Sequence, residues 1–225
     1  MKSKVTDIKT AIDVVKSGDT VLVGGFGIPG APMNLVYELM KRKEVQGLSV
    51  VSEGSLTYGV EWDHGLYRGV ADGIITELQI SFFGSKKLAP YLESGQLKLT
   101  LIPQGTLAER LHAGGAGLGG VLTPTGVGTI AEEGKQVLEI DGKKYILEKP
   151  LRGNVALIKV EKADEFGNGI CAYTGQSFNT PMATAADIVI MECHELVKTG
   201  ELDPNHIHIP GVFVDYVVHC PEVVF

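Results

Sequence analysis

The stretch Thr20-Val-Leu-Val-Gly-Gly-Phe-Gly-Ile-Pro-Gly-Ala-Pro32 joins a short apolar segment to a glycine-rich one. Thr20–Val23 predicts a buried strand, and residues 24–30 predict a turn that can take positive φ and bring backbone N–H groups close to a ligand. Pro32 is typical of the first turn of a helix, and the apolar residues after it recur at helical spacing. A strand, a glycine turn and a helix N-terminus in this order predict an anion-binding site, because unpaired N–H groups and the helix dipole converge there.

The predicted elements on both sides of this segment alternate between helix and strand. Apolar spacing predicts a first helix that is capped by Thr6 and ends at Gly18, and a later helix that is capped by Ser85. Further strands are predicted over residues 48–51, 77–83, 97–102 and 154–160. This alternation favours an α/β fold, a mostly parallel sheet with flanking helices, in one domain over residues 1–225.

Two other segments modify this simple pattern. Residues 137–147 read as two strands around an Asp141-Gly142 turn, which predicts a small β-hairpin excursion. Residues 54–69 are aromatic and spaced by glycines, without a clear period, and predict a short helix or a loop that shields the site.

Composition narrows the classes of function. The 225 residues are 44% hydrophobic and 21% charged, and the net charge is −7, which argues against nucleic acid and against an anionic membrane surface as partners. The sequence contains neither a long apolar run nor a signal-peptide pattern. Cys171, Cys193 and Cys220 are widely spaced without a C-x-x-C, as expected for reduced thiols. We therefore expect a cytoplasmic protein.

The pattern of the glycine loop by itself leaves its role open. Gly25-Phe-Gly27-Ile-Pro-Gly30 fits G-x-G-x-x-G, the dinucleotide fingerprint, and Glu53 lies at about the right distance for an acid that binds the ribose. This interpretation predicts an NAD-dependent oxidoreductase. The same residues can also form a tight turn that binds nothing. The residues expected to contact a bound ligand are Gly24, Gly25, Phe26, Gly27, Ile28, Pro29 and Gly30.

Three further positions are candidates for function or close packing. Gln104 directly follows a predicted strand, where its neutral amide can donate to a carboxylate or simply cap the next helix. Residues 113–120 contain five glycines, which predicts a loop that approaches another part of the backbone rather than a helix. His206 and His208 share a face of an extended segment but have no third ligand nearby in sequence, so no metal site is expected.

Several motifs together resemble the coenzyme A transferases. Residues 23–32 resemble the signature G-G-F-x-x-x-G-x-P of that family. The motifs of residues 103–110, 113–118, 123–129 and 132–135 follow in the order found in the alpha subunit of 3-oxoacid CoA-transferases, and the acetate/butyrate–acetoacetate enzymes are especially similar. Further similarity, including Ser177-Phe-Asn179, extends the resemblance from about residue 5 to 217.

This resemblance implies a fold of the NagB/RpiA/CoA transferase-like type and the transfer of coenzyme A between an acyl-CoA and a short-chain or 3-oxo acid, as in ketone-body and short-chain fatty acid metabolism. Coenzyme A is then a substrate bound by residues 24–30, with no tightly bound cofactor, and Gln104 supports catalysis in the carboxylate pocket. In two-chain members the nucleophilic glutamate lies in a Ser-Glu-Asn-Gly-like motif of a beta subunit. That motif is absent here, so a beta subunit is the expected partner, and a non-catalytic CoA-binding subunit is the remaining alternative.

Two departures from the family pattern bear on the substrate. Ser52-Glu53-Gly54 stands where related alpha subunits carry Ser-Asn-Asn or similar, and Gln176 stands where they often carry arginine. A gained acid and a lost cation change how a carboxylate is held. Three roles stay open for Glu53: a second catalytic nucleophile, a gate that repels an acidic substrate, or a solvated acid.

Overall fold

The computed structural model describes residues 2–55 and 65–222. Within them, eight strands form one sheet in the order β11-β10-β8-β1-β2-β3-β4, with β9 antiparallel to β8 and all other pairs parallel. The strands are β1 (Thr20–Val23), β2 (Leu48–Gly54), β3 (Ile75–Phe82), β4 (Lys98–Leu101), β8 (Gly153–Asp164), β9 (Gly169–Ile170), β10 (Ala186–Val197) and β11 (Tyr216–His219). This arrangement confirms the predicted α/β fold with a mostly parallel sheet.

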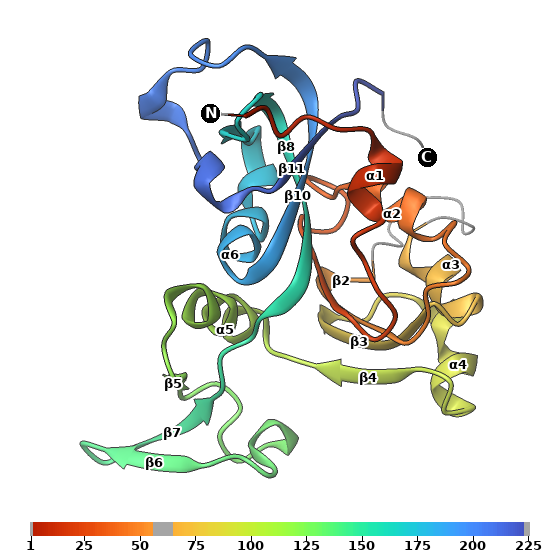
Figure 1. Cartoon of the computed structure of the whole chain (residues 1–225). Coiled ribbons are helices and arrows are strands. Elements are labelled where there is room, and N and C mark those ends of the chain that lie inside the picture. The colour runs from red at the N-terminus through yellow and green to blue at the C-terminus, as the bar shows by residue number, and fades with distance from the viewer. Residues whose placement is uncertain (1, 56–64, 223–225) are drawn as a thin grey trace.

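Helices cover both faces of the sheet (Figure 1). The α-helices are α1 (Ile8–Ile12), α2 (Met33–Leu39), α3 (Leu66–Ala71), α4 (Ala89–Glu93), α5 (Gln104–Ala116) and α6 (Asn179–Thr184). The 3₁₀ helices are η1 (Lys86–Leu88), η2 (Ile130–Glu132), η3 (Tyr173–Gln176), η4 (Pro204–His206) and η5 (Gly211–Phe213). Helices α1 to α4 pack on one hydrophobic core and α5 and α6 on the other. In this described part of the chain, no helix has the length and hydropathy to cross a membrane.

Strand β1 lies in the middle of the sheet and contributes to both cores. Val21 and Val23 face one core and Leu22 the other, because successive side chains of a strand point to opposite faces. Its carboxyl end is in register with the neighbouring strands: Val23 pairs with Ser52 of β2, which pairs with Ile80 of β3. The segments that follow these strands therefore lie along one edge of the sheet, where parallel α/β folds bind ligands.

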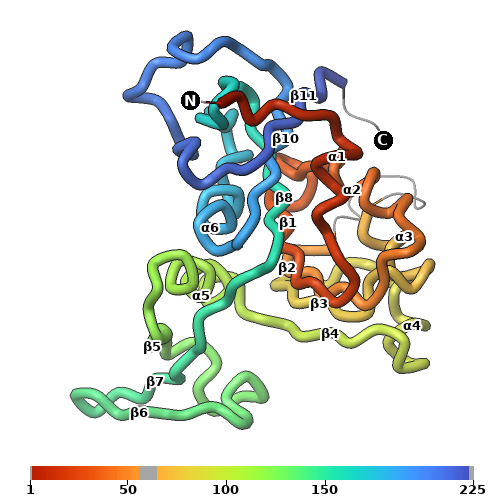
Figure 2. The backbone as a smooth tube through the Cα atoms, in the orientation of Figure 1, coloured from red at the N-terminus to blue at the C-terminus, as the bar shows by residue number. Residues whose placement is uncertain are grey.

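A second, antiparallel sheet projects from the body as an arm (residues 121–148), seen at the lower left of Figure 2. It consists of β5 (Val121–Thr123), β6 (Val137–Ile140) and β7 (Lys143–Glu148) in the order β5-β7-β6. The predicted hairpin is confirmed. Both turn residues have positive φ, 51° at Asp141 and 74° at Gly142, as the tight hairpin turn requires.

The glycine-rich segment of residues 113–120 is not a loop throughout. Helix α5 continues through Gly114 and Gly115 to Ala116 and ends at Gly117, which has φ 69°. A Cβ at Gly114 would overlap the carbonyl oxygen of Leu151, and one at Gly115 would overlap the side chain of Thr184. The expected close backbone approach is thus confirmed, but the exclusion of a helix was wrong, because packing overrides the low helix propensity of glycine.

Several predicted boundaries also differ from the structure. Helix α1 is capped by Asp7 rather than Thr6, since the Asp7 side chain accepts a hydrogen bond from the Thr10 N–H at 3.0 Å. Strand β2 continues to Gly54, so Glu53 lies in the strand and not in the loop after it. Ser85 precedes η1 without forming a side-chain cap. Of the shielding segment predicted over residues 54–69, positions 56–64 lie outside the described residues.

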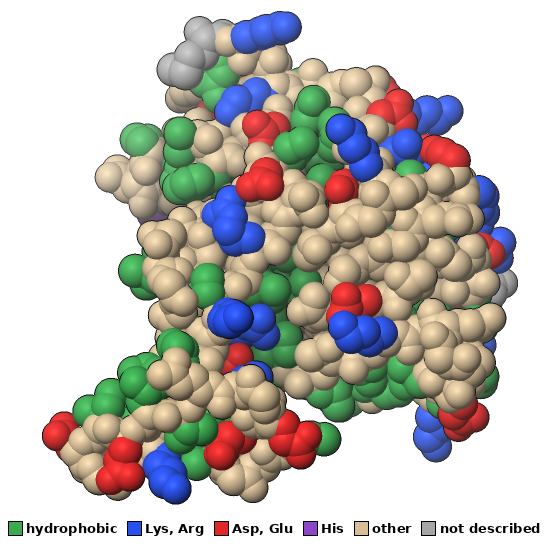
Figure 3. Space-filling view, turned by 60° about the horizontal axis from the view of Figure 1, so that its bottom comes forward, with side chains coloured by type: hydrophobic (Ala, Val, Ile, Leu, Met, Phe, Trp, Pro, Cys, Tyr) green, Lys and Arg blue, Asp and Glu red, His purple; other side chains and the backbone are tan. Residues whose placement is uncertain are grey.

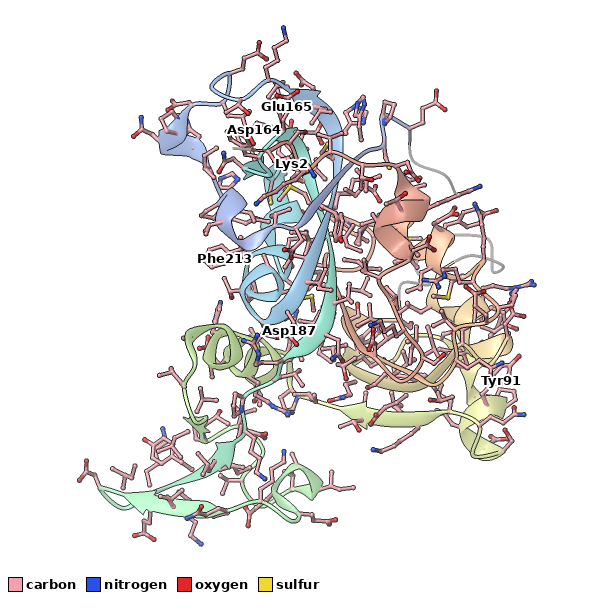
Figure 4. All side chains as sticks on the ribbon, in the orientation of Figure 1. Lys2, Tyr91, Asp164, Glu165, Asp187 and Phe213 are labelled. Carbon is pink, nitrogen blue, oxygen red and sulfur yellow. The ribbon has the colours of Figure 1, made fainter. Side chains whose placement is uncertain are left out.

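Strands β8 and β10 are the longest of the sheet, with 12 residues each. Asp187, near the start of β10, lies beside α5 in Figure 4, and its carboxylate pairs with Arg152 at 2.9 Å. Asp164, at the far end of β8, is buried and accepts hydrogen bonds from the N–H groups of Phe166 and Asn168, both at 2.9 Å. These contacts hold the start of β10 and the far end of β8 in place.

Candidate functional site

A cavity of about 590 Å³ opens at the carboxyl edge of the sheet. It is lined by residues 26–29 of the glycine loop, residues 53–55 at the end of β2, Ser81 and Phe82 of β3, and Gln104 at the start of α5. Its volume lies within the usual range of small-molecule sites, roughly 300–1,000 Å³. The fold therefore brings together the glycine loop, Glu53 and Gln104, which are far apart in the sequence.

Glu53 is buried and held at two points. Its carboxylate oxygen Oε2 accepts a hydrogen bond from the Gly27 N–H at 2.9 Å, and its main-chain carbonyl accepts one from the Ser81 hydroxyl at 2.7 Å. Only 7% of the residue is exposed. The interpretation of Glu53 as a solvated acid is therefore wrong.

The N-terminus of α2 is occupied by a carboxylate of this chain. The N–H groups of Asn34 and Leu35 donate to Glu192 Oε2 at 3.0 and 3.2 Å, and the Asn34 side chain donates to Oε1. Lys159 Nζ lies 3.3 Å from the same carboxylate. Burial raises the pKa of Glu192, and Lys159 opposes that shift. The predicted anion site is thus wrong in its helical part, because Glu192 uses the N–H groups that a ligand would need.

Asn179 holds the glycine loop in place through its side-chain amide, a role that the sequence did not predict. Its Nδ2 donates to the carbonyls of Gly30 and Gly175 at 2.9 and 2.6 Å, and its Oδ1 accepts from the Lys159 N–H at 3.0 Å. A Cβ at Gly24 would overlap the Asn179 side chain, and one at Gly30 would overlap Gly175. The Ser177-Phe-Asn179 motif was the available signal, but nothing in it indicated which backbone groups the amide would bind.

Gln104 lies between this cavity and a second hollow of about 600 Å³. Phe26 also lines both, while Gln176 belongs to the lining of the second hollow. The N-cap of α5 is Pro103, so Gln104 is the first residue of the helix. The alternative in which Gln104 serves as the cap is therefore wrong, and this exposed residue faces the cavities.

The remaining candidates form local contacts. His208 Nδ1 accepts a hydrogen bond from the Cys171 N–H at 2.9 Å, and His206 lies 2.8 Å from Asp203 at the surface. In residues 2–55 and 65–222, no group of three or more His, Cys, Asp or Glu is placed to hold a metal ion. All three cysteines are free, and burial raises their pKa values, to about 11 for Cys171 and about 12 for Cys193 and Cys220.

Comparison with known proteins identifies the family. The model of the family described as coenzyme A transferase matches residues 5–220. The chain belongs to the coenzyme A transferase family. This match confirms the resemblance seen in the motifs, and it leaves the dinucleotide-binding interpretation of the glycine loop without support.

Two bacterial CoA-transferase subunits are similar to the chain over almost their whole length. A succinyl-CoA:3-ketoacid coenzyme A transferase subunit of Helicobacter pylori is 41% identical over 218 residues, which cover 96% of this chain and 92% of that protein. The alpha subunit of the acetate CoA-transferase of Escherichia coli K12 is 40% identical over 223 residues, 99% of each chain.

Solved structures of CoA-transferases share the fold. An acyl-CoA transferase of Escherichia coli O157:H7 (YdiF), in a thioester complex with CoA, superimposes with a TM-score of 0.86 at 22% identity. The match covers 98% of this chain but 48% of that one, so the chain spans about half the length of YdiF. The glutaconate coenzyme A-transferase of Acidaminococcus fermentans gives a TM-score of 0.84 at 23% identity, over 96% of this chain and 75% of that chain.

Proposed function

We propose that this chain is the alpha subunit of a CoA-transferase that moves coenzyme A between an acyl-CoA and a short-chain or 3-oxo carboxylic acid. The observation that carries the proposal is the cavity in which residues 26–29 of the family's glycine loop meet Glu53 and Gln104. Phe26 and Phe82 line this cavity and are each 47% exposed, so the site presents two large apolar side chains to a ligand. An acyl group or the pantetheine arm of coenzyme A would cover both rings.

The glycine loop is the proposed contact for coenzyme A, which acts as a substrate and not as a tightly held cofactor. The loop is closed by a hydrogen bond from the Phe26 N–H to the Pro29 carbonyl at 3.0 Å and tied to β8 through the Gly24 N–H. Among the described residues, apart from the chain neighbours of Gly27, no atom lies within 4 Å of the place where its Cβ would be, so the thioester can approach the backbone there.

The proposed reaction needs a carboxylate nucleophile, which we assign to a glutamate of a beta subunit. That carboxylate attacks the thioester carbonyl, and coenzyme A leaves as a thiolate to give an acyl–glutamyl anhydride. The thiolate then attacks the glutamyl carbonyl, which releases the first carboxylic acid and leaves a glutamyl–CoA thioester. The acceptor acid reverses these steps and departs as the new acyl-CoA. The Gln104 amide would donate to the oxyanion of a tetrahedral intermediate.

Glu53 is a weaker candidate for the nucleophile. Its carboxylate already accepts a hydrogen bond from Gly27, and this bond stabilises the charge that an attacking oxygen would have to share. Mass spectrometry of the complex after incubation with acyl-CoA and borohydride distinguishes Glu53 from the beta-subunit glutamate as the nucleophile. We expect the reduced residue on the beta subunit, and a label on Glu53 would overturn this assignment.

The direct test is an assay with and without a co-expressed partner. The chain is purified alone and with the product of the neighbouring gene, and transfer of coenzyme A from butyryl-CoA to acetate is followed by product analysis. We expect turnover by the complex and a thermal shift with coenzyme A but not with NAD. Full turnover by the chain alone would contradict the two-subunit proposal, whereas coenzyme A binding without turnover by the complex would favour a non-catalytic binding subunit.

A further inference from the structure

The cavity combines apolar walls with a single kind of charge. Among the described residues that line it, Glu53 alone has a charged side chain. The other walls are apolar, from Phe26, Ile28 and Phe82, or neutral and polar. A negative charge in such surroundings interacts strongly with any charge on a ligand, because the walls provide little screening.

Glu53 accepts one hydrogen bond at its carboxylate and one at its main-chain carbonyl. The Gly27 N–H holds Oε2, and the Ser81 hydroxyl holds the main-chain carbonyl of the same residue. The side chain is buried, and turning it out to water would break the hydrogen bond from the Gly27 N–H. A second negative group near it would therefore meet a like charge that moves away only at the cost of that bond.

Glu53 and Gln104 are positioned by strands that are not neighbours in the sheet. Glu53 lies at the end of β2, and Gln104 follows β4, two strands farther along the sheet. With strands about 4.8 Å apart, the backbones of β2 and β4 are separated by about 10 Å. A substrate whose reacting carbonyl lies at Gln104 would thus place the far end of a short acyl chain near Glu53.

We propose that Glu53 determines which acyl group this site accepts. It excludes acyl chains that end in a second carboxylate, and it accepts neutral chains, those ending in a hydroxyl group best, because a hydroxyl can donate to the carboxylate. This inference rests on the proposed transferase function. Exclusion of a second carboxylate would distinguish the substrate of this chain from that of the Helicobacter pylori relative. The name of that relative specifies succinyl-CoA, an acyl-CoA with a free carboxylate.

The experiment uses the complex with its partner and three acyl-CoA donors of equal chain length: butyryl-CoA, 4-hydroxybutyryl-CoA and succinyl-CoA, with acetate as acceptor. For the unaltered chain we expect kcat/KM for succinyl-CoA to be on the order of 10²-fold below that for butyryl-CoA, because like charges brought together cost several kcal/mol. The value for 4-hydroxybutyryl-CoA should equal or exceed that for butyryl-CoA. These ratios need no variant, so they test the inference even if a substitution disturbs folding.

Glu53→Gln removes the charge and keeps an oxygen that can accept from Gly27. We expect the ratio of kcat/KM for succinyl-CoA to that for butyryl-CoA to rise by roughly 10- to 100-fold. Glu93→Gln makes the same charge change at an exposed position of α4 and should leave the ratio unaltered. A ratio that does not move in Glu53→Gln, or a preference of the unaltered chain for succinyl-CoA, overturns the inference. Absence of turnover with all three donors refutes the transferase proposal instead.

Discussion

Gly27 differs from the neighbouring glycines of its loop because its Cβ position is open. A Cβ at Gly24, Gly25 or Gly30 would overlap Asn179, Ala31 or Gly175, so those glycines are required for packing. Gly27 has φ 62°, and in residues 2–55 and 65–222 no atom beyond its chain neighbours lies within 4 Å of its Cβ position. It is thus the loop glycine at which the effect on a ligand can be measured with least disturbance of the fold.

We expect Gly27→Val to weaken coenzyme A binding by roughly tenfold, equivalent to about 1.4 kcal/mol. The side chain would fill the approach to the backbone, and a branched residue is strained at this φ. Gly73→Val is the matched control, since Gly73 has φ 73° and no described atom beyond its chain neighbours within 4 Å of its Cβ position. It lies just before β3, at the end of that strand away from the cavity. Titration calorimetry with coenzyme A compares the two. Equal affinities in both variants would show that the loop does not contact the ligand.

At Gln104 the expected effect is on turnover. Gln104→Ala should lower kcat on the order of 10²-fold with a smaller change in KM, because the amide is assigned to the oxyanion of the intermediate and not to the ground state. Gln96→Ala, at an exposed position before β4, controls for the loss of a surface amide. If the two variants turn over at similar rates, Gln104 has no part in the chemistry.

At the scale of single elements, α5 shows why local propensity was misleading. Glycine normally weakens a helix, yet Gly114 lies where α5 touches the backbone of Leu151. We expect Gly114→Ala to lower the free energy of unfolding by about 1–3 kcal/mol, the usual cost of overpacking. Gly105→Ala in the same helix meets no atom of the described residues outside that helix within 4 Å, and it should be neutral or stabilising by up to about 1 kcal/mol. Urea denaturation of both variants checks this; the same sign for both would contradict the packing explanation.

The start of α2 gives a prediction about pH. Burial raises the pKa of Glu192 above its ordinary value, so the folded chain holds this proton more tightly than the unfolded chain. The contribution of Glu192 to stability is therefore present at low pH and is lost as the pH rises through the raised pKa. We expect the free energy of unfolding of Glu192→Gln to fall less steeply with rising pH than that of the unaltered chain.

The matched control for Glu192 is Glu195→Gln on the same strand. Glu195 is half exposed and pairs with Lys162 at the surface at 2.8 Å, so this variant should keep the original slope. Urea midpoints between pH 5 and pH 8 give the comparison. Parallel curves for Glu192→Gln and the unaltered chain would show that the buried carboxylate does not titrate in this range.

At the scale of the whole molecule, the sequence indicated the elements but not their neighbours. The alternation of apolar strands with helices and the Asp141-Gly142 turn are local signals, and they predicted the parallel sheet and the hairpin. The sheet order, in which β8 lies between β1 and β10, depends on pairing between residues more than 130 positions apart, such as Val21 with Val155. Asn179 and Glu192 reach the glycine loop and α2 only through that order, so their roles could not be read from spacing.

The arm leads to the last prediction, which concerns association. Ile130 is 82% exposed, and Leu122 and Ile140 are 42% and 44% exposed; Figure 3 shows hydrophobic side chains along the arm at the lower left. If a beta subunit covers this surface, the chain purified alone should self-associate through it.

We expect Ile130→Lys to reduce this self-association, as measured by light scattering, while the melting temperature stays within about 2 °C because the side chain makes few contacts. Val212→Lys is the control and should leave association unchanged, because this equally exposed apolar residue belongs to η5, whose Phe213 lies far from the arm in Figure 4. The partner should also bind Ile130→Lys more weakly than the unaltered chain. Full binding of the partner by Ile130→Lys would place the interface elsewhere, and a monodisperse, fully active preparation of the chain alone would remove the reason to seek one.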